Sequence, residues 1–318
     1  MNRPRASRAT EAAAAGRGHG LSARIIGGII ITFLKALRFG DEARALRLAR
    51  AGCWLLVRAV RPARERNLEL MFGAGTISAA RRGEVERACL DYASRLHVNL
   101  GRLGGETLPG VLARVGVQGR AALEAAQAEQ RGVLVLSAHS GTWWHVPPLL
   151  VALGHRTAAI VYPGLPGPIL SYANSIAHRF GISQAYVGAG AYHTLREAFK
   201  QRQVCYVACD VNLRPEHGSW FPFGARGALA LDAGPAILAL RHRVPVVWAN
   251  TYHDAAGRSC VEFLPAFHAG RGTEWPDTEA VLRYLARRIE AQTLLRPEQW
   301  WPLGFRLIEA AAVLPRST

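Results

Sequence analysis

Short apolar runs alternate with helical patterns from residue 133 onward. The apolar runs predict strands at residues 133–138, 157–162, 183–187, 203–209 and 244–250. Helices are expected between them, at about residues 143–153, 168–180, 191–202 and 230–242. This alternation predicts an α/β fold with a mostly parallel central sheet flanked by helices. We expect residues 258–264 to add an antiparallel edge strand and residues 277–293 to form a closing helix.

The first third of the chain has helical patterns and no strand signal. Residues 79–100 carry an apolar stripe at helical spacing with charged residues off it, which predicts an amphipathic helix. The stripe consists of Val85, Cys89, Tyr92 and Leu96. Residues 121–130 are strong helix formers. In residues 42–60 an arginine recurs every third residue, at 44, 47 and 50, before the apolar GCWLLV. This pattern predicts a surface helix with one charged face.

Residues 25–34, IIGGIIITFL, form the most apolar stretch. Arg24 and Lys35 flank it, so about ten residues are free of charge, against the ~20 that span a bilayer. The stretch also begins late for a signal peptide and lacks an obvious small-residue cleavage site after it. We expect an interfacial or re-entrant helix whose arginines reach lipid headgroups. A buried core helix is the alternative.

Charge is concentrated at the N-terminus. The net charge of the chain is +16, and residues 1–66 hold fourteen basic and four acidic side chains. A basic block beside apolar residues suits an anionic membrane surface. An acidic protein would also fit, whereas no nucleic-acid motif supports a nucleic-acid partner. The sequence thus predicts a disordered basic tail at 1–20, a membrane-associating helical region at 21–66 and an α/β domain at 67–318.

The cysteines are few and scattered. Five of them in an odd count, without paired zinc spacing, argue for reduced thiols and a cytoplasmic setting. Cys205 and Cys209 lie in a strand-like run and fit the core better than a metal site. We therefore propose neither a metal nor a cofactor from the sequence.

Two side chains follow predicted strands where chemistry is commonly placed. His139 comes after the run 133–138, and Asp210 comes after the run 203–209. The carboxyl ends of parallel strands meet at one edge of the sheet, so these residues are expected to face one crevice. Backbone N–H groups near Gly141 are expected to hold developing negative charge. The alternatives are a histidine and an aspartate that merely cap turns.

Other candidates follow in the same half of the chain. Asn212 shares the loop of Asp210, although its case is weaker. The aromatic turn WFPFG contains Phe223 and Gly224, and it would wall an acyl pocket, dip into a membrane interface or pack the core. Arg226 fits phosphate binding or a pair with Asp232. Arg179 ends a predicted helix, where a cation is also common for dipole reasons.

From residue 60 to residue 306 the chain resembles the lysophospholipid-acyltransferase-like enzymes of the late lipid A acyltransferase family. The order and spacing of several blocks carry this resemblance. They are ERNLELMF (65–72), AHSGTWW (138–144), IVYPG (160–164), NSIAHRFGI (174–182), ACDVN (208–212), FPFGAR (221–226), GPAILALRHRVPVV (234–247) and RPEQWWPLGFR (296–306).

The resemblance implies an acyltransferase on the cytoplasmic face of the bacterial inner membrane, peripheral or monotopic. Such enzymes move a fatty acyl chain from acyl carrier protein, or sometimes acyl-CoA, to a hydroxyl of a membrane glycolipid. It implies that His139 is the general base. Together with the candidates above, the expected substrate-binding residues are Gly141, Arg179, Asn212, Phe223, Gly224 and Arg226. An anionic membrane surface is the expected partner, and no nucleic acid is.

Two positions depart from the family pattern HxGNWE. Thr142 replaces the usual Asn, and Trp144 stands where a Glu or Asp is expected after four intervening residues. A carboxylate there would orient the histidine and stabilise the imidazolium, and tryptophan has no charge. Asp210, which matches an aspartate of a later family motif, is the expected substitute, although Val211 replaces the Gln of that motif.

Three interpretations of Trp144 stay open. Asp210 supplies the charge, His139 works slowly without help, or the chain is an impaired membrane-attached homologue that binds lipid or acyl carrier. The C-terminal block also departs from the family pattern, because Gly304 or Phe305 replaces a histidine while Arg306 is kept. A soluble α/β hydrolase is a weak alternative, since no Gly-x-Ser-x-Gly elbow follows a strand.

Overall fold

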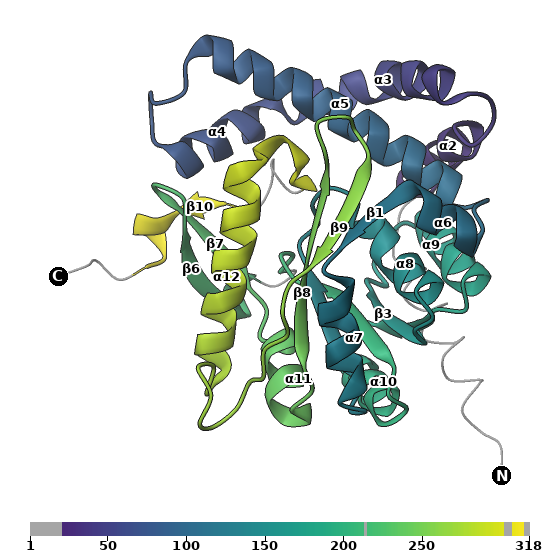
Figure 1. Cartoon of the computed structure of the whole chain (residues 1–318). Coiled ribbons are helices and arrows are strands. Elements are labelled where there is room, and N and C mark those ends of the chain that lie inside the picture. The colour runs from purple at the N-terminus through teal and green to yellow at the C-terminus, as the bar shows by residue number, and fades with distance from the viewer. Residues whose placement is uncertain (1–20, 213–214, 302–306, 315–318) are drawn as a thin grey trace.

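A computed structural model gives the fold and describes residues 21–212, 215–301 and 307–314. The expected tail at 1–20 and Arg306 lie outside these residues. Figure 1 shows a central sheet with helices on both faces and a helical layer across one end. That layer contains α2 (Leu21–Ala36), α3 (Glu42–Ala59), α4 (Arg61–Phe72) and α5 (Ala79–Leu103). Helix α4 runs through the expected boundary at residue 66.

The central sheet has seven strands in the order β1-β9-β8-β2-β5-β3-β4. Their bounds are β1 (Val115–Gln118), β2 (Val133–Ser137), β3 (Thr157–Val161), β4 (Ser183–Tyr186), β5 (Val204–Ala208), β8 (Val246–His253) and β9 (Ser259–Phe263). Strands β8, β2, β5, β3 and β4 are mutually parallel. The predicted α/β class with a mostly parallel sheet is therefore confirmed.

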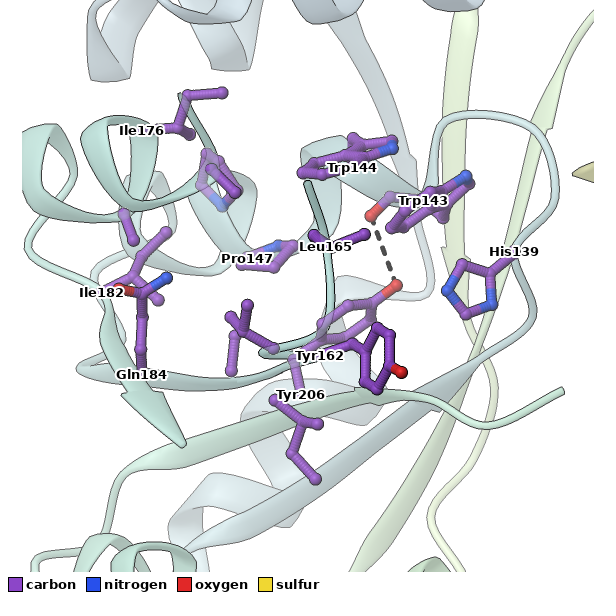
Figure 2. Close-up of a pocket in the computed structure, with 16 residues that line it drawn as sticks. His139, Trp143, Trp144, Pro147, Tyr162, Leu165, Ile176, Ile182, Gln184 and Tyr206 are labelled. Carbon is purple, nitrogen blue, oxygen red and sulfur yellow. Dashed lines mark hydrogen bonds between the residues drawn. The ribbon is translucent and has the colours of Figure 1, made fainter. Parts of the chain in front are cut away.

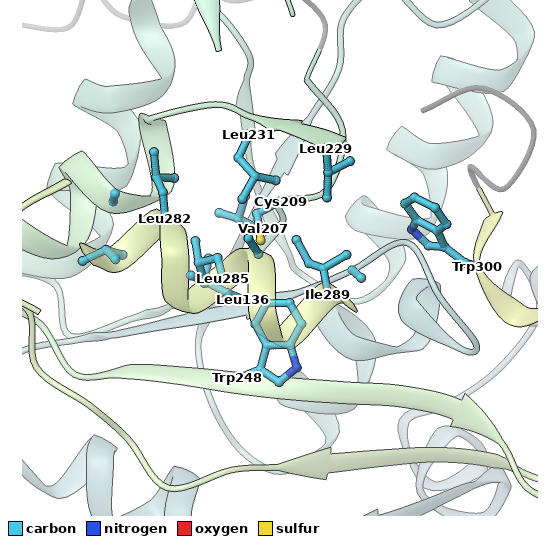
Figure 3. Packing of buried hydrophobic residues seen from close by; sticks show 14 of the residues in the cluster. Leu136, Val207, Cys209, Leu229, Leu231, Trp248, Leu282, Leu285, Ile289 and Trp300 are labelled. Carbon is cyan, nitrogen blue, oxygen red and sulfur yellow. The ribbon is translucent and has the colours of Figure 1, made fainter. Parts of the chain in front are cut away.

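Both faces of this sheet are covered, which explains the unbroken apolar runs. Leu134 and Leu136 of β2 point into one hydrophobic cluster. Val133 and Val135 of the same strand point into another. A strand that is buried on both sides reads as a continuous hydrophobic segment. Figure 3 shows Leu136 in the first cluster, together with Leu282, Leu285 and Ile289 of α12 (Thr278–Leu295).

The remaining helices flank the sheet close to the predicted positions. They are α6 (Leu108–Arg114), α7 (Arg120–Ala128), α8 (Val146–Ala152), α9 (Gly167–Arg179), α10 (Ala189–Lys200) and α11 (Gly234–His242). The expected helix at 143–153 begins with a 3₁₀ turn, Trp143–His145, before α8. Pro147 lies in the first turn of α8, where a missing backbone N–H costs nothing.

One strand prediction needs a correction. Residues 258–264 do contain an antiparallel strand, because β9 pairs antiparallel with β8. It is not an edge strand, since β1 pairs parallel with its other side. Strand β1 is only four residues long, VGVQ, and follows α6 without a break. A segment this short gives too little alternation to be read from the sequence.

The predicted helix at 230–242 is also wrong over its first residues. Residues 227–231, GALAL, form β7 (Gly227–Leu231) in a small antiparallel sheet with β6 (Ser219–Phe223) and β10 (Ile308–Glu309). Alanine and leucine favour helices locally. Pairing with β6 overrides that preference, and α11 starts only at Gly234.

Helix α5 lies across the carboxyl edge of the parallel strands. The Tyr92 hydroxyl on α5 donates to the Gly141 carbonyl at 3.3 Å, and the Asn99 amide lies 3.3 Å from His253 Nε2 at the end of β8. In Figure 1 this helix crosses above the β8–β9 hairpin. The helical layer therefore covers the sheet edge at which His139 and Asp210 lie.

Helix α2 has one buried and one exposed apolar face. Its buried face packs on α5 and α9 through residues such as Ile31 and Leu34. Its exposed face carries Ile25, Ile26, Ile29 and Ile30. Within the described residues, none of the helices combines the length and the hydropathy that crossing a bilayer requires.

Candidate active site

The register of two neighbouring strands brings His139 and Asp210 together. Strands β2 and β5 end with Ser137 opposite Ala208. His139 and Asp210 each lie two residues further along. The His139 Nδ1 atom lies 2.5 Å from Asp210 Oδ1, and the His139 backbone N–H donates to the same oxygen at 2.9 Å. The two side chains are thus brought together as expected, although Asp210 is fully buried and only His139 lines the neighbouring cavity.

Asp210 is fully buried and yet surrounded by donors. Its second oxygen, Oδ2, accepts a hydrogen bond from the Trp300 indole Nε1 at 2.7 Å. Burial alone would raise the pKa of Asp210. The charge and hydrogen bonds of His139, together with the Trp300 indole, outweigh burial and hold that pKa below its usual value. Asp210 is therefore a carboxylate at neutral pH.

This contact defines which nitrogen of His139 is available for chemistry. A carboxylate beside Nδ1 accepts the proton of that nitrogen, so the neutral ring carries its free electron pair on Nε2. The His139 side chain is 19% exposed, whereas Asp210 is 0% exposed. The arrangement can thus take a proton from a substrate at Nε2 and stabilise the imidazolium through Asp210.

An apolar cavity of about 210 Å³ begins at His139. Figure 2 shows His139 at one end and Gln184 with Ile182 at the other. The edge of Trp143 meets the His139 ring at 4.4 Å between centroids. The wall comes mainly from α8, β3 and α9 and is dominated by aliphatic and aromatic side chains. A cavity of this kind fits a hydrocarbon chain better than a polar ligand.

Tyr206 of β5 fixes the floor of the cavity near His139. Its hydroxyl lies 2.6 Å from Ser137 Oγ and donates to the Trp143 carbonyl at 3.3 Å, the contact dashed in Figure 2. Burial raises the pKa of Tyr206, which keeps the phenol protonated. Tyr206 therefore ties the turn after β2 to the neighbouring strand.

Trp144 is part of the cavity wall. Its ring lies 4.5 Å from the Trp143 ring, and both indoles line the cavity. The position at which the family resemblance predicts a carboxylate thus presents an apolar surface to the cavity. Of the sequence interpretations of Trp144, the geometry favours the one in which Asp210 supplies the charge.

The expected role of Gly141 needs a correction. Its backbone N–H donates to the Gln299 carbonyl at 3.0 Å, so this group is not available for an oxyanion. Gly141 has φ +52°, and a Cβ atom there would lie 2.2 Å from the Cα of Tyr252. Glycine is required here by backbone conformation and by close packing.

Asn212 and Phe223 are buried away from the cavity. Asn212 lies two residues after Asp210, with its amide against Gly218. Phe223 is 0% exposed and stacks on Trp300 at 5.4 Å between ring centroids. Phe223 therefore packs in the core against Trp300, the partner of Asp210, and does not line the cavity, which corrects the expectation that it binds substrate.

Three further candidates lie outside the cavity. Arg179 is exposed in the last turn of α9. Gly224, at φ +66°, turns the β6–β7 hairpin and donates its N–H to Glu290 Oε1 at 2.6 Å. Arg226 is exposed on that hairpin, 3.9 Å from Glu309. The structure brings none of the three to the cavity, because the hairpin belongs to the small second sheet and the Arg179 side chain projects into solvent.

Trp300 is the residue in contact with Asp210 that sequence reasoning missed. It lies ninety residues after Asp210, in the block RPEQWWPLGFR. The block was visible, but its link to Asp210 depends on tertiary packing that no local pattern reports. Together, a histidine paired with a buried carboxylate and an apolar cavity at the sheet edge define an α/β protein that combines a candidate general base with room for a hydrocarbon chain.

Comparison with protein families agrees with this class. The model of the bacterial lipid A biosynthesis acyltransferase family matches residues 22–307. The chain therefore belongs to the bacterial lipid A biosynthesis acyltransferase family, whose members are acyltransferases. No curated protein matches the chain.

Proposed function

We propose that this acyltransferase moves a fatty acyl chain from a thioester donor, acyl carrier protein or acyl-CoA, to a hydroxyl of a membrane glycolipid of the lipid A kind. The His139–Asp210 pair at the end of an apolar cavity is the observation that carries the proposal. The cavity suits the acyl chain, and its histidine end suits the thioester carbonyl. Family membership supports acyl transfer in general.

In the proposed reaction the acceptor hydroxyl lies against His139 Nε2. The hydroxyl oxygen attacks the thioester carbonyl carbon while Nε2 takes its proton, and a new C–O bond forms. Collapse of the tetrahedral intermediate breaks the C–S bond. His139 then returns the proton to the leaving thiolate. Asp210 holds the ring through Nδ1 and stabilises the imidazolium that exists between these steps.

We place the enzyme on the cytoplasmic face of the bacterial inner membrane, as a peripheral or monotopic protein. Helices α2 and α3 expose large apolar side chains, which include Ile25, Ile26, Ile29, Leu48, Trp54 and Leu55. A hollow between α3 and α5 adds Arg58 and Arg87 beside Trp54. Aromatic and cationic side chains around apolar ones suit an anionic interface.

Part of the N-terminal charge serves the fold itself. Arg64 is 1% exposed, donates to the Val57 carbonyl at 3.0 Å and pairs with Glu86 at 3.2 Å. Arg50 pairs with Asp91 across the α3–α5 contact. We therefore expect only part of the basic block to face a membrane. Arg47 and Arg58 are exposed on α3 and lie outside the ion pairs Arg44–Asp41 and Arg50–Asp91.

The experiment that tests the proposal measures acyl transfer directly. The purified protein is incubated with acyl carrier protein or CoA thioesters and a bacterial lipid extract, and products are identified by mass spectrometry. His139→Ala is expected to lower the rate by at least ~10²-fold, which is the usual contribution of a general base. Exposed His193 offers a matched control, so His193→Ala should match wild type.

Asp210→Asn should lose activity about as severely as His139→Ala. The double variant should be hardly worse than either single one, because residues that act as a unit are not additive. Activity of Asp210→Asn within a few-fold of wild type would remove Asp210 from the mechanism. Failure of the wild-type protein to transfer acyl chains from either donor to any extracted lipid would favour a homologue that only binds lipid or carrier.

A further inference from the structure

The segment Pro297–Trp301, here called the C-terminal clamp, contacts the turn after β2 on both sides of Ser140. The Trp301 backbone N–H donates to the His139 carbonyl at 2.9 Å. The Gly141 N–H donates back to the Gln299 carbonyl at 3.0 Å, and Ser140 forms an antiparallel bridge with Trp300. The backbone around His139 is thus paired with the clamp as if by a short strand.

The clamp is itself fixed to the central sheet. The Gln299 side chain accepts from the His253 backbone N–H at 2.7 Å and donates to the His253 carbonyl at 2.9 Å. These two bonds satisfy both backbone groups of the last residue of β8. The clamp therefore fixes the turn that carries His139 relative to the end of β8.

Trp300 adds a side-chain contact to these backbone contacts. Its indole is 1% exposed, stacks on Phe223 with 16° between the rings and donates to Asp210 Oδ2 at 2.7 Å. Asp210 Oδ1 meanwhile accepts from both the backbone and the ring of His139. The two oxygens of one buried carboxylate are thus assigned to different donors. Figure 3 shows Trp300 at the margin of the hydrophobic cluster.

We infer that Trp300 is a positioning residue, whose indole N–H fixes the rotation of the Asp210 carboxylate so that Oδ1 faces His139 Nδ1. The inference rests on the proposed roles of His139 and Asp210. Without the indole N–H, Oδ2 would lose a charge-assisted hydrogen bond in a fully buried place. The carboxylate would then rotate, and His139 would lose the alignment and the charge that it needs in the transition state.

The test replaces Trp300 with phenylalanine, which keeps an aromatic ring on Phe223 and removes the donor. Trp300→Phe is expected to lower kcat by about 10-fold to 100-fold, the range for a charge-assisted hydrogen bond, and to change KM for either substrate less than twofold. Trp248→Phe is the matched control. Trp248 is also fully buried, and its indole donates to Asn250 Oδ1 at 2.8 Å, away from the site. This control should lower Tm by a similar amount and leave kcat unchanged.

A second arm asks whether the effect passes through Asp210. In the Asp210→Asn background, Trp300→Phe should cost less than about twofold more, because the two residues share one interaction. If Trp300→Phe proves too unstable to assay, benzothienylalanine at position 300 replaces the indole N–H with sulfur and keeps the bicyclic shape. The same loss of kcat is expected from it.

The outcomes separate this inference from the proposed function. Wild-type kcat in Trp300→Phe or in the benzothienylalanine protein overturns the inference, as does an undiminished loss in the Asp210→Asn background. An equal loss of kcat in Trp248→Phe would reduce Trp300 to a structural residue. Full activity in Asp210→Asn would remove the proposed role of Asp210 and this inference with it, whereas the proposed function fails only if the wild-type protein transfers no acyl chain.

Discussion

The indole of Trp144 occupies the position at which the family resemblance predicts a carboxylate. In this chain the carboxylate reaches His139 from a different element, because β5 lies beside β2 and Asp210 lies at the start of the loop after β5. The charge that a helical turn would supply from position 144 therefore comes from a neighbouring strand. The freed position forms part of the cavity wall, with its ring against Trp143.

Restoring a carboxylate at position 144 should therefore harm the enzyme. Trp144→Glu places an ionisable group in an apolar wall, where an unpaired charge is costly, and it leaves a cavity where the indole was. We expect a roughly 10-fold or greater loss of kcat/KM and a lower Tm. Steady-state kinetics and thermal unfolding measure both. Trp144→Phe, which keeps the wall apolar, should lose less of each.

The opposite result for Trp144→Glu would be informative. A rise in activity with an intact fold would mean that His139 lacks effective help from Asp210 in the wild-type protein. The pairing at 2.5 Å would then be a structural contact without a catalytic part.

At the scale of elements, the sequence predicted the strands that are buried on both faces. Strands β2 and β5 are such strands, and their apolar runs predict them within a few residues. Strands β3, β4 and β8 also lie within a few residues of their predicted positions, although β4 (SQAY) is a partly exposed edge strand. The elements that were missed are short or locally ambiguous. VGVQ in β1 has four residues, and GALAL in β7 looks helical until it pairs with β6.

The candidate site was predicted where strand ends define it and missed where long-range packing does. His139 and Asp210 follow parallel strands, so the shared edge was foreseeable. Arg226, Gly224 and Phe223 belong to the β6–β7 hairpin, whose separate sheet was invisible in the pattern. Trp300 reaches Asp210 only through the folded position of the C-terminal clamp.

Helices α2 and α3 form the element that we expect to meet the membrane. The double change Ile26→Asn and Ile29→Asn should weaken sedimentation with vesicles of phosphatidylglycerol and phosphatidylethanolamine, because the exposed face of α2 loses apolar area. Leu295 is 69% exposed at the end of α12, so Leu295→Asn is the matched control and should bind as wild type.

The arginines of α3 should contribute an electrostatic share to the same binding. Arg47→Gln and Arg58→Gln should each weaken binding roughly fivefold, corresponding to about 1 kcal/mol per cation near an anionic surface. High salt should remove this share and spare the apolar one. Equal binding of the isoleucine double variant, the arginine variants and wild type would argue against membrane association through α2 and α3.

At the scale of the whole molecule, buried polar groups join the helical layer, the sheet and the C-terminal clamp. His253 at the end of β8 is 4% exposed, lies beside Asn99 of α5 and holds Gln299 through its backbone. Its ring also meets Tyr92, which bonds the turn after β2. A charge on His253 would therefore be placed where three parts of the fold meet.

Burial keeps His253 and His145 neutral in the folded state. It lowers the pKa of His253 to about 4, helped by the charge of Arg95 and opposed by Asp254. Burial likewise lowers the pKa of His145 to about 3, and His145 lies 2.6 Å from the Thr142 hydroxyl. In the unfolded chain both should titrate near their ordinary value of about 6.5. Between these values the unfolded state binds more protons than the folded state.

The free energy of unfolding should consequently be highest above about pH 6.5, where these histidines are neutral in both states. It should fall as the pH drops toward 4, because only the unfolded chain then binds the protons. The slope approaches about 1.4 kcal/mol per pH unit for each histidine well inside that window. The Asp210 carboxylate, whose pKa is lowered below its ordinary value, also stabilises the fold, and this stabilisation is lost only below about pH 4.

Urea unfolding at pH 7.5, 6 and 5 measures how the free energy of unfolding changes with pH. His253→Gln should flatten it by about one proton, whereas His193→Gln, at an exposed site, should leave it unchanged. A slope that is identical in His253→Gln and wild type would mean that His253 accepts its proton without disturbing the contact between α5, β8 and the clamp.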